Sequence, residues 1–366
     1  MSKLFSPFKL RGLTLENRIV VAPMCQYSAD DGSATDWHMQ HVGMLSHSGA
    51  ALVVLEATGV EREGRITPGC LGLYSDENER ALKRVIDSVR RYSKTPLGIQ
   101  LAHAGRKASA ASPWNGAKPL RPDQGAWQTM APSAIPFDEG WPTPKALSRG
   151  EIDRVVESFA RAAERARRIG FDEVELHYAH GYLAAAFLSP IANKREDEYG
   201  GSLENRMRFA LRVAEAVRAV WPADKPLGAR ITGTDWVEGG FTTDDAVVLA
   251  RELKARGCDF ACVSSGGVNS KARAPVAAGF LLPHAERVRR EGEIATRAVG
   301  FIVKAQQAEA AIAEGKADMV ALARAVLDDP RWGWHAAEEL GATAAYPVQY
   351  ERVRPSAWPG AKMARP

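Results

Sequence analysis

The amino-acid sequence predicts an α/β protein, a closed (β/α)8 TIM barrel in which eight parallel strands are each followed by a helix. Short runs of apolar and β-branched residues alternate with longer helical patterns along the whole chain. The strands are apolar enough to be covered on both faces, as the strands of a parallel barrel are. No Gly-x-Gly-x-x-Gly run follows any of these strands, which weighs against the open sheet of a dinucleotide-binding domain.

Composition limits the classes of protein to consider. The 366 residues are 45% hydrophobic, enough to bury the core of one large α/β domain or of two smaller domains. Lys and Arg exceed Asp and Glu by only 48 to 44 and are scattered, so we expect no nucleic-acid or membrane partner. The four cysteines are too few and too irregularly spaced for a disulfide scaffold, which favours a reducing compartment. Residues 1–20 contain polar residues throughout instead of an apolar signal segment, and we expect a cytoplasmic protein.

The strands are predicted from short apolar runs. Phe8–Leu10 and Leu13–Leu15 flank Arg11-Gly12, which predicts an N-terminal hairpin that caps the bottom of the barrel. The eight barrel strands are predicted at residues 18–24, 51–58, 97–103, 173–177, 227–231, 259–264, 294–299 and 319–323.

Helical patterns fill the segments between these strands. Asp76 and Thr243 are predicted helix caps, and Ser148 with Glu151 three residues later forms a capping box. The predicted helices are one ending near residue 48, one beginning at Ser202, and those at residues 76–92, 148–169, 243–256, 285–290, 304–314 and 332–340. Residues 104–147, rich in Pro, Trp and Gly, are a long excursion after the third strand, and we expect it on the active-site side of the barrel as a lid.

The end of the fourth strand carries the strongest candidates for chemistry. A run of alternating polar and apolar residues ends at His177, and His180 and Tyr182 follow at once. Catalytic side chains of (β/α)8 barrels project from the C-terminal ends of the strands. Two imidazoles and a phenol at one strand end therefore predict a site.

The other strand ends share the same mouth. Arg230 is notable because a buried guanidinium needs an anionic partner. Small residues after the seventh and eighth strands mark the place where barrels commonly bind a phosphate group, so a phosphorylated ligand is expected. The other residues predicted at the mouth are Met24, Cys25, Tyr27, Ala57, Thr58, Gln100, His103, Ser264, Ser265, Gly300 and Arg324.

A second reading of the same residues is a metal-dependent hydrolase. His177 and His180 would be the ligands, and His103 and Glu56 would have to complete the set because other partners are scarce at the strand ends. The plainest alternative is that both histidines are ordinary core residues.

Several motifs resemble the Old Yellow Enzyme family of FMN-dependent ene-reductases. They are Asn-Arg-Ile-Val-Val-Ala-Pro-Met-Cys-Gln-Tyr at 17–27, Gly-Ile-Gln-Leu-Ala-His-Ala-Gly-Arg-Lys at 98–107, His-Tyr-Ala-His-Gly-Tyr at 177–182, Asp-Glu-Tyr-Gly-Gly-Ser-Leu-Glu-Asn-Arg at 197–206, Ala-Val-Gly-Phe-Ile at 298–302, and Ala323-Arg324. Cys25, Tyr27 and residues 347–352 resemble the subgroup of xenobiotic reductases and thermophilic-like members. The resemblance covers nearly the whole chain and implies one FMN-binding domain over residues 1–366.

The resemblance implies where FMN would bind. Its phosphate would lie on backbone amides near Val299, Gly300, Ala323 and Arg324. The isoalloxazine contacts would be Pro23, Met24 and Ala57, with Gln100 at the pyrimidine edge, Arg230 beside N1 and the C2 carbonyl, and Cys25 tuning the reduction potential.

The resemblance also implies a reaction. NADPH, or NADH, would reduce FMN, and an α,β-unsaturated carbonyl or related activated alkene would then be reduced. His177 and His180 would hold the carbonyl oxygen and Tyr182 would protonate the α-carbon, while Tyr27 and Lys107 would help to bind the substrate. A barrel that only binds ligands would need a degraded site, whereas the expected positions carry competent side chains.

The tail and three substitutions complete the resemblance. In the subgroup a C-terminal arginine reaches a neighbouring subunit's pocket, so Arg352 and the tail 341–366 are predicted at a subunit interface of a homodimer or homotetramer. Val299 stands where some xenobiotic reductases have a tryptophan, and Ala323 replaces a glycine common before the arginine. Arg297, inside the seventh strand, has no role that the resemblance explains.

Overall fold

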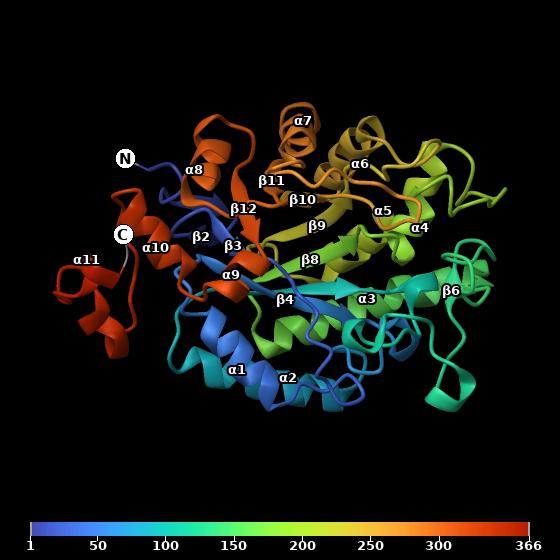
Figure 1. Cartoon of the computed structure of the whole chain (residues 1–366). Coiled ribbons are helices and arrows are strands. Elements are labelled where there is room, and N and C mark those ends of the chain that lie inside the picture. The colour runs from blue at the N-terminus through green and yellow to red at the C-terminus, as the bar shows by residue number, and fades with distance from the viewer. Residues whose placement is uncertain (1, 365–366) are drawn as a thin grey trace.

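Eight parallel strands close into a barrel, which confirms the predicted fold class. The structure is a computed structural model and describes residues 2–364. Around the barrel the strands pair in the order β10-β11-β12-β3-β4-β5-β8-β9 (Figure 1). Their bounds are β3 Ile19–Val21, β4 Leu52–Gly59, β5 Leu97–Ala102, β8 Glu173–Tyr178, β9 Leu227–Thr232, β10 Phe260–Ser264, β11 Ala295–Ala298 and β12 Met319–Leu322.

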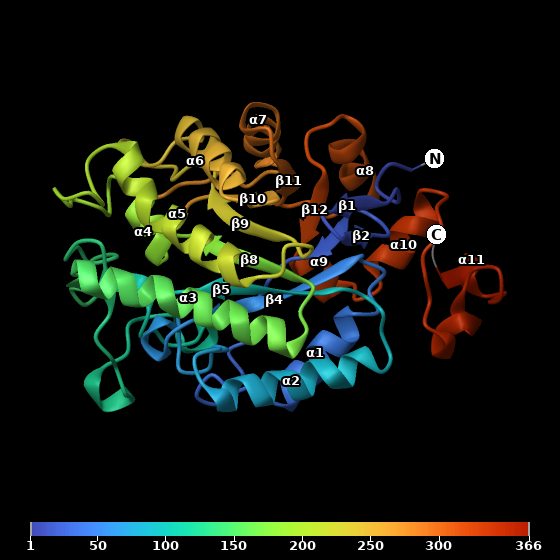
Figure 2. The same cartoon turned by 180° about the vertical axis from the view of Figure 1, so that it is seen from behind.

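Helices surround the barrel on its outer side, as Figure 2 shows for the face that carries α2 and α3. Their bounds are α1 Asp36–Leu45, α2 Asp76–Arg90, α3 Arg149–Ile169, α4 Leu183–Leu188, α5 Leu203–Val220, α6 Thr243–Ala255, α7 Leu282–Gly292, α8 Ala305–Ala313, α9 Arg324–Asp328, α10 Trp332–Glu339 and α11 Ala361–Ala364. The predicted capping box of Ser148 and Glu151 is present at the start of α3. The predicted cap at Thr243 is wrong by one residue, because the Thr242 side chain accepts from the Asp245 N–H and completes a capping box there.

Alternate strand residues divide between two apolar cores. Those that point outward pack against the helices, for example Ile19 and Val21. Those that point inward form a separate cluster inside the barrel, to which the hairpin of β1 (Phe8–Leu10) and β2 (Leu13–Leu15) contributes buried leucines. The hairpin therefore caps the barrel as predicted. The inward cluster is Leu10, Leu15, Val20, Ala22, Ala51, Leu52, Val54, Phe260, Cys262, Leu281, Val299, Met319 and Ala321.

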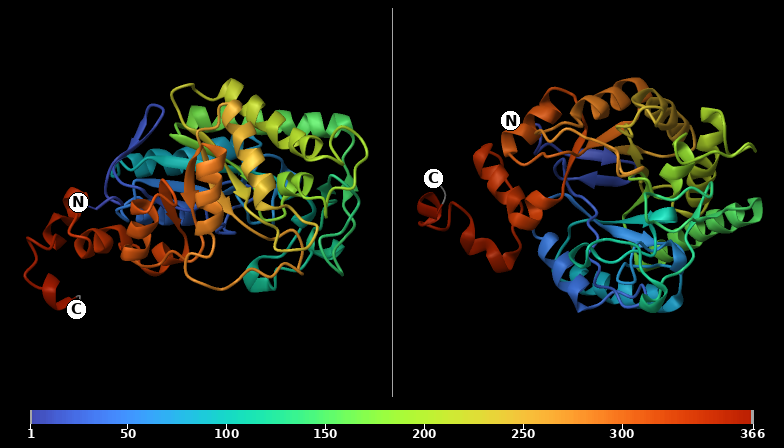
Figure 3. Two further views of the ribbon diagram at one scale, coloured as in Figure 1. Left: turned by 90° about the horizontal axis from the view of Figure 1, so that it is seen from above. Right: turned by 45° about the vertical axis from the view of Figure 1, so that its right-hand side comes forward.

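Two regions lie outside the regular barrel. The excursion after β5 contains short 3-10 turns and the paired strands β6 (Met130–Ala131) and β7 (Lys145–Ala146), and it packs against α4. The C-terminal tail includes the 3-10 helix η5 (Val348–Val353) and lies beside α10, to one side of the barrel (Figure 3). Within residues 2–364 no helix is both long and apolar enough to cross a membrane.

Candidate active site at the mouth of the barrel

Three side chains meet at the C-terminal end of β8. The ring centroids of His177 and His180 are 5.0 Å apart, those of His177 and Tyr182 are 5.1 Å apart, and the rings stand nearly perpendicular to one another. His180 adopts a left-handed backbone conformation with φ 61°, which turns the chain sharply after the strand. The predicted gathering of two imidazoles and a phenol is therefore present.

Burial fixes the protonation of these groups. Burial, with the nearby Arg230 and Lys107 charges, holds the pKa values of His177 and His180 well below the usual range. The Ala179 N–H donates to Nδ1 of His177 at 3.3 Å, so the proton of the neutral ring lies on Nε2. Burial also raises the pKa of Tyr182 well above its ordinary value. At neutral pH the site therefore holds neutral imidazoles and a protonated phenol.

A serine joins the second histidine to the arginine of β9. Nε2 of His180 lies 2.7 Å from Oγ of Ser264, and Nη2 of Arg230 donates to the same oxygen at 3.4 Å. Nε of Arg230 is buried and has no hydrogen-bond partner among residues 2–364. A half-buried cation whose buried Nε–H has no partner fits a ligand that carries carbonyl or anionic character at the mouth.

Lys107 braces the turn that carries His180. Its Nζ donates to the carbonyl oxygens of His180 at 2.8 Å and Gly267 at 3.1 Å. It also lies 4.6 Å from the ring centroid of Phe137 and 5.0 Å from that of Tyr182. Burial lowers its pKa to about 8. The ammonium group is thus engaged by contacts within the protein. A substrate contact for Lys107 stays a prediction.

The loop after β3 holds Cys25 and Tyr27. A hydrogen bond with Cys70, together with burial, raises the pKa of Cys25, so it stands as a thiol. Tyr27 has φ 51°, and its ring meets the Trp114 ring of the excursion edge-on at 5.6 Å. Neither Cys70 nor Trp114 was predicted, because each lies far along the sequence from the residue that it contacts.

A cavity of about 240 Å³ lies between the C-terminal ends of β10, β11 and β12. Two guanidinium groups, two hydroxyls and several small residues are among its lining groups, which is donor chemistry suited to a phosphate group. Gly300 has φ 103°, and a Cβ there would lie 3.0 Å from the Leu281 side chain, so the position favours glycine. The lining residues include the predicted Val299, Gly300, Ala323, Arg324 and Arg230, with Ser264, Ser265, Phe280 and Leu281.

The remaining predicted cofactor residues follow the neighbouring strands. Pro23 and Met24 follow β3, Ala57 lies on β4, and Gln100 lies on β5, which pairs with β4 and β8. Gln100 is buried, and its Nε2 donates to Oε1 of Glu175 at 2.7 Å. The cavity and its donors fit a flavin phosphate at one end of the mouth. The Gln100 amide fits the flavin ring at the other end.

Arg297 meets two carboxylates inside the barrel. Its guanidinium pairs with Glu173 at 2.9 Å and with Glu175 at 3.1 Å, and all three side chains are fully buried. The sequence marked Arg297 as unexplained, and no local pattern could have identified partners from another strand. The Arg297 charge is therefore paired with carboxylates inside the barrel.

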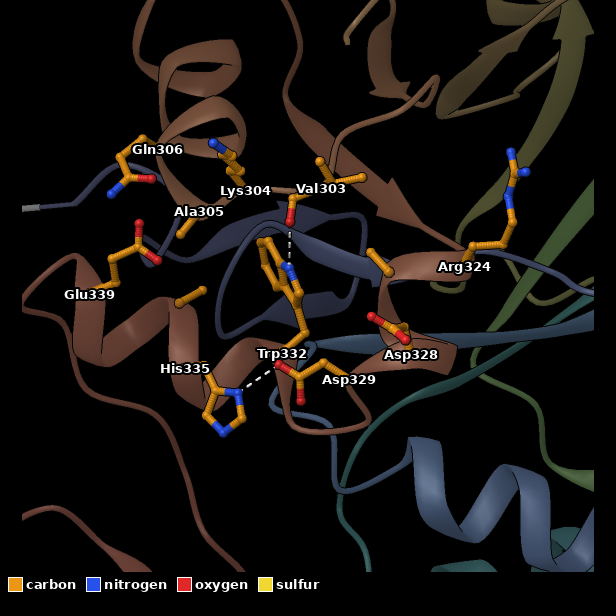
Figure 4. Close-up of a pocket in the computed structure, with 12 residues that line it drawn as sticks. Val303, Lys304, Ala305, Gln306, Arg324, Asp328, Asp329, Trp332, His335 and Glu339 are labelled. Atoms are coloured by element: carbon orange, nitrogen blue, oxygen red, sulfur yellow. Dashed lines mark hydrogen bonds and ion pairs between the residues drawn. The ribbon is translucent and has the colours of Figure 1, made fainter. Parts of the chain in front are cut away.

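An open groove of about 890 Å³ lies outside the mouth, beyond the phosphate-type cavity. Figure 4 shows Trp332 on its floor, where Nε1 donates to the Val303 carbonyl oxygen at 2.9 Å, and His335 2.6 Å from Asp329. Arg324 stands at its edge and also lines the smaller cavity.

The metal-site reading is not favoured. Glu56 lies 3.4 Å from His38, and His103 accepts from the Gly105 N–H and lies 3.5 Å from Glu61, so neither joins the histidines of β8. Within residues 2–364 no three His, Cys, Asp or Glu side chains gather where they could hold a metal ion.

Arg352, the predicted interface arginine, is exposed on η5.

Comparison with known proteins gives concordant results. The family described as NADH:flavin oxidoreductase / NADH oxidase matches residues 3–342. An NADPH dehydrogenase of Geobacillus thermodenitrificans (strain NG80-2) is 44% identical over 351 residues, which cover 95% of this chain and 98% of the relative. The structure of morphinone reductase in complex with tetrahydroNAD has a TM-score of 0.75 and 29% identity, covering 97% of this chain and 93% of that one. A 2-naphthoyl-CoA reductase has a TM-score of 0.82 at 24% identity, which shows the fold alone; the match covers 93% of this chain but only 52% of that longer protein.

Proposed function

Because this chain belongs to the NADH:flavin oxidoreductase / NADH oxidase family, as an NADPH-dependent FMN oxidoreductase of the Old Yellow Enzyme type, we propose that it reduces activated alkenes such as α,β-unsaturated carbonyl compounds. The observation that carries the proposal is the cluster of two neutral imidazoles and one protonated phenol at the end of β8. FMN, when bound and reduced by NADPH, supplies the hydride that the β-carbon of the alkene accepts.

His177 and His180 bind and polarise the substrate. Nε2–H of His177 is available to donate to the carbonyl oxygen, because Nδ1 is already engaged by the backbone. Donors that are neutral and held in place favour the enolate-like charge that develops on this oxygen without taking up a proton themselves. Ser264, 2.7 Å from Nε2 of His180, keeps that ring in position.

Tyr182 delivers the proton to the α-carbon. Its raised pKa keeps the proton on the phenol oxygen across the neutral pH range, as a general acid requires. The Lys107 ammonium, 5.0 Å from the Tyr182 ring centroid, packs against the phenol. Tyr27, with Trp114 against its ring, is assigned to holding the substrate.

The residues that would hold FMN support the same proposal. Val299, Gly300, Ala323 and Arg324 line a cavity whose size and donors suit the phosphate. At the ring end we assign Pro23, Met24, Ala57, Gln100 and Arg230. Cys25, which stands as a thiol, is assigned to tuning the flavin potential without nucleophilic attack.

The test is an absorption spectrum of the purified protein, followed by anaerobic addition of NADPH and then of cyclohexenone. We expect a flavin spectrum that bleaches with NADPH and returns with the enone. In His177→Ala we expect the bleaching to persist and the return to require far more enone. A flavin that bleaches but is not reoxidised by enones would overturn alkene reduction, and equal loss of both steps in His177→Ala would overturn the role of that residue.

A further inference from the structure

A charged layer crosses the barrel interior below the mouth. Arg297 on β11 donates from Nη2 to Glu173 at 2.9 Å and from Nη1 to Glu175 at 3.1 Å. The side chains of all three residues have 0% exposure. The guanidinium carbon lies 4.2 Å from the ring centroid of Phe260, and Gly228 leaves room for that ring, because a Cβ at Gly228 would lie 2.4 Å from it. The layer is thus closely packed on the side away from the mouth.

This layer reaches the mouth through one amide. Glu175 accepts from Arg297 with Oε2 and from Nε2 of Gln100 with Oε1, at 2.7 Å. An ionised carboxylate only accepts hydrogen bonds, so it must face the NH2 of the amide and not the carbonyl oxygen. The amide of Gln100 is therefore held in one orientation, with Oε1 left for another donor.

Arg297 supports this orientation, because its Nη1 donates to Oε2 of Glu175 and leaves Oε1 to face the amide. A buried carboxylate without a cation takes up a proton, and a protonated carboxyl group both donates and accepts. Glu175 could then face either end of the Gln100 amide. The planar guanidinium also serves both carboxylates at once, which an ammonium at a single point cannot match.

We propose that Arg297 is a positioning residue for the flavin, which acts through Glu175 to orient the Gln100 amide so that Oε1 accepts a hydrogen bond from the pyrimidine edge of FMN. This inference rests on the proposed contact between Gln100 and the flavin. It gives a function to Arg297, which the family resemblance leaves unexplained.

The test measures FMN affinity in a mutant cycle. Arg297→Met with Glu173→Met removes the ion pair and puts apolar side chains of similar length in both positions, leaving Glu175 without its cation. We expect the FMN dissociation constant, measured from the fluorescence released as holoenzyme is diluted, to rise about tenfold, as for loss of one hydrogen bond. Gln100→Ala should cause a similar rise, and the triple variant should bind no more weakly than Gln100→Ala.

Three controls make the outcome decisive. Riboflavin affinity should fall as much as FMN affinity in the Met pair, because the effect is at the ring, whereas Arg324→Ala should weaken FMN and spare riboflavin. Thermal unfolding of each flavin-free chain reports whether the barrel persists. If the Met pair does not fold, Glu175→Gln, which keeps the pair of Arg297 and Glu173 but frees the amide, should give the same tenfold loss.

Unchanged FMN affinity in the folded Met pair, or in Glu175→Gln, overturns the inference. The inference also fails if the triple variant binds FMN a further tenfold more weakly than Gln100→Ala, since Arg297 would then act by another route. If Gln100→Ala alone leaves FMN affinity unchanged, the inference also fails. The proposed function is judged separately, because bleaching by NADPH and return with enone do not depend on this affinity.

Discussion

The mouth of the barrel shows how burial at single residues selects their chemistry. Burial lowers the pKa values of His177 and His180 and raises that of Tyr182, so all three groups are uncharged at neutral pH. The imidazoles can then donate without competing for the substrate proton, and the phenol keeps the proton that the reaction consumes.

Tyr182→Phe separates the two halves of the catalytic cycle. Removing the phenol oxygen takes away the proposed proton donor and leaves the ring, so the enone half-reaction should slow by about 100-fold or more. Reduction of the flavin by NADPH should keep its wild-type rate, because no proton from Tyr182 is needed there. Stopped-flow absorbance of each half-reaction measures both rates. His177→Phe is the matched control, because it should weaken enone binding without removing the proton donor. An unchanged enone rate would mean that another acid or water supplies the proton.

Residues close in sequence were predictable, and residues joined across strands were not. His177, His180 and Tyr182 were found because one strand end brings them together, and Arg230 because a guanidinium in a strand is costly. Their gathering at one mouth is present in the structure, while their roles stay predictions. The partners of Arg297 needed the closed barrel, since β8 and β11 are not adjacent in its strand order.

At the scale of elements, apolar periodicity predicted the barrel and missed its shortest pieces. Every predicted barrel strand is present, and the ends differ by at most one residue except in the first strand, predicted at 18–24 and observed at Ile19–Val21. α4 and α9 were missed because five or six residues are too few to show a helical period. α7 is longer than predicted and begins at Leu282, with a proline in its first turn.

Glu173 on β8 makes the free energy of unfolding depend on pH. Burial raises the pKa of Glu173 from 4.5 to about 7, against the attraction of Arg297. The folded state therefore holds this proton more tightly than the unfolded chain, and the contribution is present below about pH 4.5 and lost as pH rises through about 7. The shift corresponds to about 3 kcal/mol.

Glu173→Gln should remove this dependence. We expect the free energy of unfolding of the wild type, relative to Glu173→Gln, to fall by up to about 3 kcal/mol between pH 5 and pH 8. Urea unfolding at several pH values measures it, and Glu79→Gln, which removes ion pairs with Arg165 and Arg168 outside the barrel, is the control for general charge effects. A constant difference between wild type and Glu173→Gln would show that Glu173 is ionised throughout this range.

At the scale of the whole molecule, the tail is set apart from the barrel mouth. Tyr346 packs on Trp334 of α10 with ring centroids 4.3 Å apart, and Arg331 lies 5.2 Å from the ring of Tyr350. These contacts anchor the start of the tail on α10, and Arg352 is exposed. Figure 3 shows the tail to one side of the barrel. An arginine presented in this way is suited to reach the mouth of a second copy, which is the role that we propose for it.

Truncation before Tyr346 tests this arrangement. If the tail completes a neighbouring site, the shortened chain should form smaller assemblies in sedimentation experiments and show a KM for enone raised by about tenfold, as for loss of one charged hydrogen bond. Arg352→Ala should raise the KM similarly while leaving the assembly intact, because the anchoring aromatic contacts remain. Arg354→Ala is the matched control, since that side chain already pairs with Glu351 within the tail. Mixing Arg352→Ala chains with His177→Ala chains should restore part of the activity, since a mixed assembly pairs an intact pocket with an intact tail. Unchanged kinetics in the truncated chain would refute the shared site.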